Sequence, residues 1–417
     1  MSSAKEFPVS PLAPSRFPDL PQVGGMILST ASLGLYRGAS RDDLLLVHFP
    51  DGASAGGVFT TSLTRSADVD WCREALASGG GRAKVLVVNA GNSNAFTGAA
   101  GVAKNRATVE TASRLAGCSP DHVFLAATGV IGEPLDPGLV SGGVAKAWPT
   151  MAPPDWERAA NAIRTTDTFA KASGARARVG SASVAIAGFA KGSGMIAPNM
   201  ATTLNYVFTD AALSPSAVQT LIARYCDLTF NCITVDGDTS TSDTLMIFAT
   251  GASGGDVILD ADDPLLAEFR EALHGVLKDL ALQIVRDGEG AGKLIEISVS
   301  GARDDRSAKT MAASIANSPL VKTAIAAGDA NWGRVVMAVG KAGEPVDRDL
   351  LSIWFGDHRV AREGARDPDY SEALATAAVA GPEVMIRVDA GIGGGCATVW
   401  TCDLTDGYVK INGAYRS

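Results

Sequence analysis

Residues 262–285, DDPLLAEFREALHGVLKDLALQIV, carry the clearest structural signal in the chain. Apolar side chains recur here at three- and four-residue steps, the spacing of a helix with one buried face; they are Leu266, Phe269, Leu273, Leu277, Leu280 and Ile284. Asp262, Asp263 and Pro264 precede them and are typical of a helix start. We therefore predict a helix over Pro264–Val285 whose apolar stripe packs on a sheet.

Short apolar runs on both sides of this helix supply the strands of such a sheet. We expect strands at Asp43–Phe49, Lys84–Asn89, His122–Ala127, Ser183–Phe189, Leu204–Phe208, Thr244–Thr250, Leu294–Val299, Arg334–Val339 and Val384–Asp389. Further helices are predicted at Lys104–Leu115, Asp155–Ile163, Ser216–Cys226 and Pro319–Ala327. The mixture indicates an α/β or α+β chain. Polar, glycine-containing residues suggest a connection at 170–183 and a boundary near 301–310.

Composition narrows the class of protein. The chain has 417 residues, of which 46% are hydrophobic and 19% charged, as expected of a folded protein with room for two to three domain-sized units. The net charge of -9 disfavours nucleic acid and anionic membranes as partners. We expect no secretory leader in the proline-rich residues 1–22 and no membrane span. Six cysteines without a CxxC pair favour a reduced, cytoplasmic compartment.

Common catalytic and ligand-binding motifs are absent or incomplete. The four histidines are scattered, so neither a histidine triad nor a metal site is expected. Residues 288–293, GEGAGK, look like a phosphate loop, but Leu294 replaces the hydroxyl that holds magnesium. The aspartates of VDGDTSTSDT (235–244) lack the glutamate that closes a calcium loop, which leaves a turn rich in hydroxyl groups.

Two threonine-containing segments have an unusual backbone. Residues 191–202, KGSGMIAPNMAT, combine glycines with Pro198 directly before an apolar strand. In residues 126–133, AATGVIGE, a strand ends in Thr128–Gly129 and exposes a hydroxyl and a glycine N–H. Such a pair is either a simple turn or a set of donors for a developing oxyanion. By residue type alone, an internal threonine is usually structural.

Taken together, the motifs resemble those of the glutamate N-acetyltransferase/ornithine acetyltransferase family of arginine biosynthesis. They run from about residue 20 to the end of the chain: VVNAGNSNAFTG (87–98), AATGVIGE (126–133), TTDTF (165–169), KGSGMIAPNMAT (191–202), ITVDGDTSTSDT (233–244), DGEGAGKLIE (287–296), LVKTAIAAGDANWGR (320–334) and WTCDLTDGYVKINGAYRS (400–417).

The resemblance implies a layered α-β-β-α sandwich of the ornithine acetyltransferase/DmpA type that cuts its own backbone between Ala201 and Thr202. An α chain, 1–201, with a proline-rich strap at 1–22, and a β chain, 202–417, would share one core, with a smaller C-terminal subdomain at about 305–417. Thr202 becomes N-terminal and serves as nucleophile, because its freed α-amine, with a pKa of roughly 7.7–8.0, can act as base. Two α and two β chains would form a heterotetramer.

The implied reaction moves the acetyl group of N-acetylornithine to glutamate through acetyl-Thr202, with Thr128 and Gly129 as the oxyanion hole. The substrate contacts carried over by the resemblance are Thr165, Lys191, Thr202, Glu289, Asn412 and Ser417. No cofactor or metal is implied, and acetyl-CoA is an open second donor. An amidase or aminopeptidase of the same fold, with water as acceptor, and a non-catalytic binding protein are the alternatives. The chain departs from the family pattern at Cys232, Ser242 and Gly292.

Overall fold

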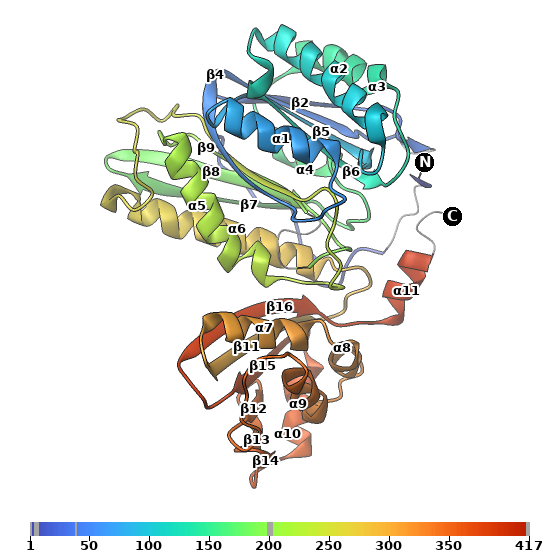
Figure 1. The fold of residues 1–417 in the computed structure, drawn as a ribbon, viewed down its shortest axis with the longest axis vertical. Coiled ribbons are helices and arrows are strands. Elements are labelled where there is room, and N and C mark those ends of the chain that lie inside the picture. Colours follow the sequence, from blue (N-terminus) through green and yellow to red (C-terminus); the bar gives the residue numbers. More distant parts are fainter. Residues whose placement is uncertain (1, 4–7, 38–39, 198–202, 414–417) are drawn as a thin grey trace.

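The structure is a computed structural model of the whole chain and describes residues 2–3, 8–37, 40–197 and 203–413. The predicted junction residues Ala201 and Thr202 and the terminal Ser417 lie outside the described residues. Strands and helices alternate, and the strands form an eight-stranded sheet, a six-stranded sheet and the short pair β1(Ser2–Ser3) and β3(Tyr36–Arg37). Figure 1 shows the two larger sheets in separate parts of the molecule. Among the described helices, none is long and apolar enough to cross a membrane.

The eight-stranded sheet is assembled around one long strand, β4(Leu44–Phe59). The first half of β4 pairs with β2(Ile27–Ala31) and β5(Arg82–Asn92), and its second half pairs with β10(Thr244–Ala249) and, at Ala53 and Ser54, again with β5. The remaining strands follow outward on the two sides: β6(Val123–Val130) next to β5, and β9(Leu204–Thr209), β8(Ala182–Lys191) and β7(Lys171–Val179) beyond β10. A register irregularity between His48 and Ala53 separates the two halves of β4.

These two halves of the sheet pack face to face. Their shared interior contains Phe49 and Phe124 from one half and Phe208 and Phe248 from the other, all fully buried. The Phe49 and Phe248 rings stack with centroids 5.0 Å apart, and Phe124 meets Phe248 edge-on at 6.1 Å. Aromatic pairs of this kind add about 0.5–1.5 kcal/mol each beyond their burial.

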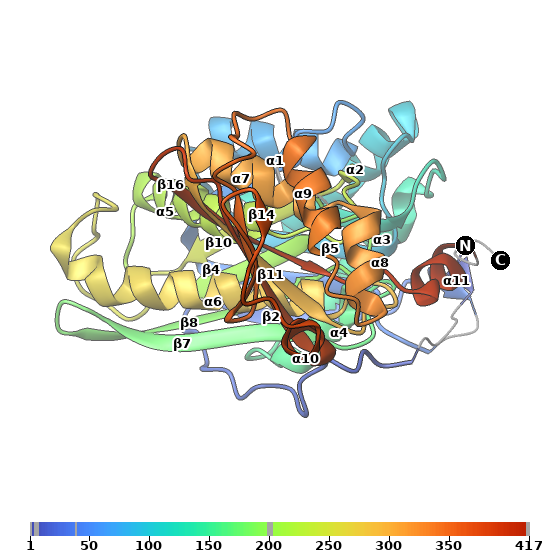
Figure 2. The same cartoon turned by 90° about the horizontal axis from the view of Figure 1, so that it is seen from below.

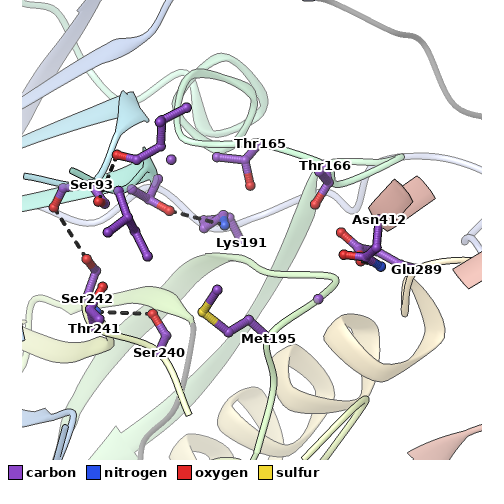
Figure 3. A pocket seen from close by; sticks show the side chains of 15 residues that line it. Ser93, Thr165, Thr166, Lys191, Met195, Ser240, Thr241, Ser242, Glu289 and Asn412 are labelled. Carbon is purple, nitrogen blue, oxygen red and sulfur yellow. Dashed lines mark hydrogen bonds between the residues drawn. The ribbon is translucent and has the colours of Figure 1, made fainter. Parts of the chain in front are cut away.

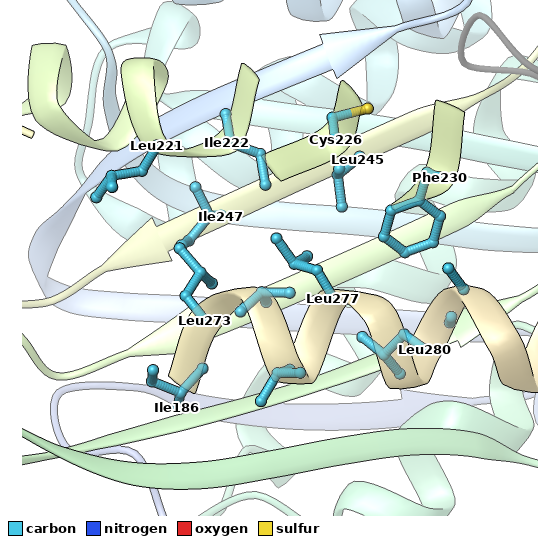
Figure 4. Packing of buried hydrophobic residues seen from close by; sticks show 14 of the residues in the cluster. Ile186, Leu221, Ile222, Cys226, Phe230, Leu245, Ile247, Leu273, Leu277 and Leu280 are labelled. Carbon is cyan, nitrogen blue, oxygen red and sulfur yellow. The ribbon is translucent and has the colours of Figure 1, made fainter. Parts of the chain in front are cut away.

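Helices cover both outer faces of this double layer (Figures 1 and 2). One outer face packs on α2(Gly98–Ala116) and α3(Pro137–Ala147). The other packs on α5(Pro215–Leu228) and α6(Ala267–Arg286) (Figure 4). The order of layers is helix, sheet, sheet, helix, which confirms the predicted α-β-β-α sandwich.

The predicted helix over Pro264–Val285 is confirmed as a short turn, η4(Pro264–Leu266), followed directly by α6. The Asp263 carboxylate accepts a hydrogen bond from the Leu265 N–H at 2.8 Å and caps the start. The apolar stripe is buried against the sheet, as its spacing requires; Leu273, Leu277 and Leu280 are 0% exposed (Figure 4). Each such side chain contributes about 1.5–3 kcal/mol through burial.

The second sheet takes its strands from residues 294–402. Its order is β14(Ala365–Arg366), β13(His358–Arg362), β12(Ser352–Phe355), β15(Glu383–Asp389), β11(Leu294–Ala302) and β16(Gly395–Cys402). It has its own core with α7(Asp305–Ala316), α8(Pro319–Ala326), α9(Trp332–Gly340) and α10(Glu372–Ala380). Trp400 and Cys402 of β16 reach the core beneath α6 and thereby join the two parts. The chain then continues into α11(Asp406–Gly413).

Two predictions of local structure are wrong. The strand expected at Arg334–Val339 lies within helix α9, because the Asn331 side chain caps the Arg334 N–H and the buried residues recur at helical spacing. The connection expected at 170–183 is instead a hairpin of β7 and β8, with Lys171 opposite Ala190. Its polar residues occupy the exposed positions of an edge strand, which a composition-based interpretation takes for a loop.

Candidate active site

A cavity of about 350 Å³ lies at the ends of β6 and β8 (Figure 3). Widely separated parts of the chain form its wall: the end of β6, the end of β8, the loop before β11 and helix α11. Each predicted site residue that the structure describes lines this cavity, and these are Thr128, Gly129, Thr165, Lys191, Glu289 and Asn412.

The backbone at the end of β6 fixes Thr128 and Gly129 at the cavity wall. Gly129 has a φ of 130°, and a Cβ atom here would lie 2.4 Å from the backbone carbon of Gly91 on β5. Only glycine fits at this position without displacing backbone. The register between β5 and β6 is irregular at the same place. Thr128 is 8% exposed, so its hydroxyl faces a confined space.

Lys191 ends β8 and brings a cation into the cavity. Its Nζ donates a hydrogen bond to the Thr128 Oγ1 at 3.3 Å, and the residue is 4% exposed. Burial disfavours the charged form and lowers the pKa of Lys191, while the carboxylates of Asp167, Asp243 and Glu289 act in the opposite direction. An ammonium with so little water around it is suited to binding a substrate carboxylate.

Glu289 provides a carboxylate at the opposite part of the wall. Its Oε2 accepts a hydrogen bond from the Asn412 Nδ2 at 2.7 Å, and its backbone N–H donates to the Ser193 carbonyl at 2.9 Å. Burial raises the pKa of Glu289, and hydrogen bonds from Asn412 and Thr166 partly oppose that rise. The loop after β8 touches this carboxylate, because a Cβ atom on Gly194 would lie 2.4 Å from Oε2.

The loop leading toward the predicted junction is held by one aspartate. Asp236 accepts hydrogen bonds from the N–H groups of Met195 at 2.6 Å and Ile196 at 2.9 Å. The Tyr408 hydroxyl of α11 donates to the same carboxylate at 3.2 Å. Met195 has a φ of 58°, which is uncommon for a residue with a side chain. These contacts fix a strained backbone at Met195, seven residues before Thr202.

A buried ion network supports the Thr165 wall from behind. The Lys171 Nζ lies 2.6 Å from the Asp167 Oδ1 and 2.5 Å from the Asp287 Oδ2, and all three side chains are 0% exposed. Asp167 also accepts from the Gly192 N–H at 2.6 Å, directly after Lys191. Burial raises the pKa of Asp287. Burial acts on Asp167 in the same direction, but the charges of Lys171 and Lys191 outweigh it and hold the pKa of Asp167 below its usual range. The network therefore ties three segments of the cavity wall together.

Several lining residues were not predicted as site residues: Ser93, Val130, Ile131, Thr166, Gly194, Met195, Ser240, Thr241 and Ser242. For Ser240, Thr241 and Ser242 the signal was the density of hydroxyl groups in VDGDTSTSDT (235–244), a segment that is expected from its sequence to be a turn. Ser242, one of the departures from the family pattern, lies in the wall, and its hydroxyl donates to the Ser93 carbonyl at 3.4 Å.

The histidines, Lys293, Cys232 and Gly292 do not line this cavity. None of the four histidines, all in the described part of the chain, lines this cavity. Lys293 of the segment that looks like a phosphate loop donates to the carbonyls of Ile325 and Val379, a structural role. Cys232 belongs to the core under α6, and the Gly292 N–H donates to the Asp403 carboxylate at 2.8 Å.

A protein-family model and several relatives of known name match nearly the whole chain. The model of the ArgJ family matches residues 28–417. The arginine biosynthesis bifunctional protein ArgJ of Rhizobium meliloti (strain 1021) is 56% identical, over 98% of this chain and 99% of its own. The protein of the same name from Brucella suis biovar 1 is 55% identical over the same shares. The crystal structure of the arginine biosynthesis bifunctional protein argJ from Bacillus halodurans is 41% identical, covers 50% of this chain and 98% of its own, and has a TM-score of 0.49. The family model and the two relatives from Rhizobium and Brucella show that the chain belongs to the ArgJ family, as its acetyltransferase motifs predict.

Proposed function

We propose that this ArgJ-family acetyltransferase of arginine biosynthesis moves the acetyl group of N-acetylornithine to glutamate through an ester on Thr202, releasing ornithine and N-acetylglutamate. The observation that supports this most directly is the convergence of six predicted site residues from distant segments on one cavity. The wall also includes residues on both sides of the predicted junction, from Lys191 to Met195 before it and from Ser240 to Ser242 after it.

The nucleophile in this proposal is created by cleavage between Ala201 and Thr202. Thr202 then carries both a hydroxyl group and a free amine, and the amine is neutral often enough near pH 7–8 to act as base. The strands on the two sides of the junction support stable association of the cleaved chains. β8 from the α chain pairs antiparallel with β9 from the β chain, with Lys191 opposite Leu204, inside one shared core.

In the first half-reaction, the Thr202 hydroxyl attacks the acetyl carbonyl and passes its proton to its own amine. The oxyanion receives hydrogen bonds from the Thr128 hydroxyl and the Gly129 N–H. The Thr128 oxygen accepts from Lys191, which leaves its own proton free to donate into the cavity. Ornithine departs with the proton held by the amine. In the second half-reaction, the amine of glutamate attacks the acetyl ester and restores the Thr202 hydroxyl.

Recognition of the two substrates relies on opposite charges in the wall. Both ornithine and glutamate carry an α-carboxylate, for which Lys191 is the partner, whereas Glu289 attracts a cationic amine. Thr165 and Asn412 add polar groups to the same wall, and we assign Ser417 to the same role. A volume of about 350 Å³ is at the lower end of the usual range for small-molecule sites and suits a single amino acid.

We further propose that acetyl-CoA serves as a second donor, because relatives that match the whole chain are named bifunctional. The assay uses purified protein with glutamate as acceptor and tests N-acetylornithine and acetyl-CoA separately. N-acetylglutamate formation from N-acetylornithine is the expected result. Release of free acetate at the same rate with and without glutamate would instead indicate an amidase and contradict the transferase.

We propose that two α and two β chains assemble in the cytoplasm. None of the six cysteines, all in the described part of the chain, forms a disulfide, and burial raises the pKa of Cys72 and Cys226 to about 12, so these thiols remain protonated and unreactive. Size-exclusion chromatography with light scattering tests the assembly. A mass equal to one α and one β chain would contradict it.

A further inference from the structure

Met195 is an apolar side chain in a cavity wall that is otherwise mostly polar. It lines the cavity of the candidate active site and is 39% exposed, whereas the next residue, Ile196, is 0% exposed. Figure 3 shows the Met195 side chain directed into the cavity, with its thioether end on the side of Lys191. A single exposed apolar residue on an outer surface needs no explanation. One that is directed into a polar cavity can contact a ligand there.

The backbone at Met195 also points to a role of its side chain. Its φ of 58° lies in the left-handed region, which glycine adopts without a steric penalty and methionine does not. Such outliers persist only where the surrounding structure holds them. Here the Asp236 carboxylate accepts from the N–H groups of Met195 and Ile196, and the Ile196 carbonyl accepts from the Val235 N–H at 2.9 Å and the Thr234 hydroxyl at 3.0 Å. A methionine is thus held where glycine would fit more easily.

The segment that carries Met195 also contacts both charged groups of the wall. Lys191 lies four residues earlier and brings its ammonium into the cavity. Gly194, directly before Met195, lies against the Glu289 carboxylate, where an added Cβ atom would be 2.4 Å from Oε2. Residues 191–195 therefore present a cation, a contact with a carboxylate and a flexible apolar side chain to one cavity.

We propose that Met195 is a specificity-determining residue that packs against the methylene chain of the amino acid substrate. This inference rests on the proposed function, in which Lys191 binds the α-carboxylate and Glu289 attracts the side-chain ammonium of N-acetylornithine. The three methylene groups of ornithine then span the space between these two charges, and the Met195 thioether covers them. Glutamate has one methylene group fewer. Methionine is unbranched and flexible, so it can adapt to both chain lengths.

Ile131 offers a comparison within the same wall. It also lines the cavity and is 37% exposed, but it follows Thr128 and Gly129, which we assign to the oxyanion. Ile131 is therefore expected on the side of the acetyl group and not along the methylene chain. Truncating Ile131 should affect donors of every chain length alike, whereas truncating Met195 should change the preference among them.

The experiment measures kcat and KM on purified protein whose complete cleavage has been confirmed on a denaturing gel. The donors are the N2-acetyl derivatives of 2,4-diaminobutyrate, ornithine and lysine, with two, three and four methylene groups, and glutamate is the acceptor. The test variant is Met195→Ala, and Met195→Leu returns the apolar volume. Ile131→Ala is the control within the wall. Met337→Ala is the control outside it, because Met337 is 38% exposed on α9.

We expect the wild type to prefer the ornithine derivative. Met195→Ala should lower kcat/KM for N-acetylornithine by about 10–200-fold, the range for an apolar contact of one methylene group, and mainly through KM. The loss should be smaller for the lysine derivative, whose extra methylene group fills part of the vacated space. Met195→Leu should restore the preference, Ile131→Ala should keep the wild-type order of the donors, and Met337→Ala should match the wild type. Unchanged ratios among the three donors in Met195→Ala would refute the role of Met195.

Two further arms cover the remaining outcomes. If Met195→Ala is not cleaved, Met195→Gly takes its place, because glycine tolerates the positive φ. If that chain is not cleaved either, the wild type decides: a preference for the ornithine derivative supports the proposal, and equal kcat/KM for the three donors refutes it. Wild-type protein that transfers no acetyl group from N-acetylornithine contradicts the proposed function. An active wild type with an indifferent Met195→Ala variant contradicts only the role of Met195.

Discussion

The ammonium nitrogen of Lys191 lies 3.3 Å from the hydroxyl oxygen of Thr128, a hydrogen bond that joins the two halves of the folded sheet. Lys191 ends β8 in one half and Thr128 lies near the end of β6 in the other. Because lysine can only donate, the threonine oxygen must accept, and its own proton is directed elsewhere. The Lys191 ammonium thus orients the Thr128 hydroxyl, to which we assign stabilisation of the oxyanion. It also places a positive charge beside that hydroxyl.

Substituting Thr128 with alanine should lower kcat for the transfer from N-acetylornithine to glutamate by about 10²–10³, the usual cost of one oxyanion donor. Thr128→Ser keeps the hydroxyl and is the matched control, with activity expected near that of the wild type. Steady-state kinetics on fully cleaved protein measure both. An equal loss of kcat in Thr128→Ala and Thr128→Ser would mean that catalysis depends on the methyl group of Thr128 and not on its hydroxyl.

Lys191 should make substrate affinity depend on pH. Burial lowers its pKa, so the cation is present at low pH and is lost as pH rises through a value below that of an ordinary lysine, about 10.4. The KM for glutamate should therefore rise toward alkaline pH. Lys191→Arg keeps the charge and should remove this rise, whereas Lys191→Met should have a high KM at every pH. A pH-independent KM in the wild type would contradict this assignment.

Self-cleavage predicts two polypeptides of 201 and 216 residues on a denaturing gel, the second beginning Thr-Thr-Leu-Asn-Tyr. Thr202→Ala should abolish both cleavage and transfer, because the nucleophile is lost and the amine is never freed. Thr202→Ser should retain part of both activities, since it lacks one methyl group only. Mass spectrometry of an acetyl adduct locates the intermediate. Transfer through an adduct in folded, uncut Thr202→Ala protein would place the nucleophile elsewhere.

Removing Lys171 should destabilise the fold strongly. Lys171→Met leaves the carboxylates of Asp167 and Asp287 buried without their shared cation, and breaking a buried pair in this way costs about 3–5 kcal/mol. The control is Arg224→Met, which removes an ion pair with Asp262 on the surface and should change the unfolding free energy little. Urea unfolding followed by circular dichroism compares them. Similar small losses in both would show that the network is dispensable.

Local patterns predicted much of the secondary structure because local physics sets it. The stripe from Leu266 to Ile284 needs only helical spacing and a cap, and it lies on the sheet as expected. The same reasoning failed at Arg334–Val339, where an apolar run fits a strand or a helix equally well. The Asn331 cap decides that case. At 170–183, the pairing partner β8 turns a polar segment into a strand.

By itself, the sequence determined the family, the helices with strong apolar periodicity and the identity of the threonines, lysine and glutamate that we assign to the site. Only the tertiary structure placed Lys191 against Thr128 and Asn412 against Glu289. The physical reason is that periodicity and capping act over a few residues. Contacts between residues 63 or 123 positions apart arise only when strand register and layer packing bring distant segments together.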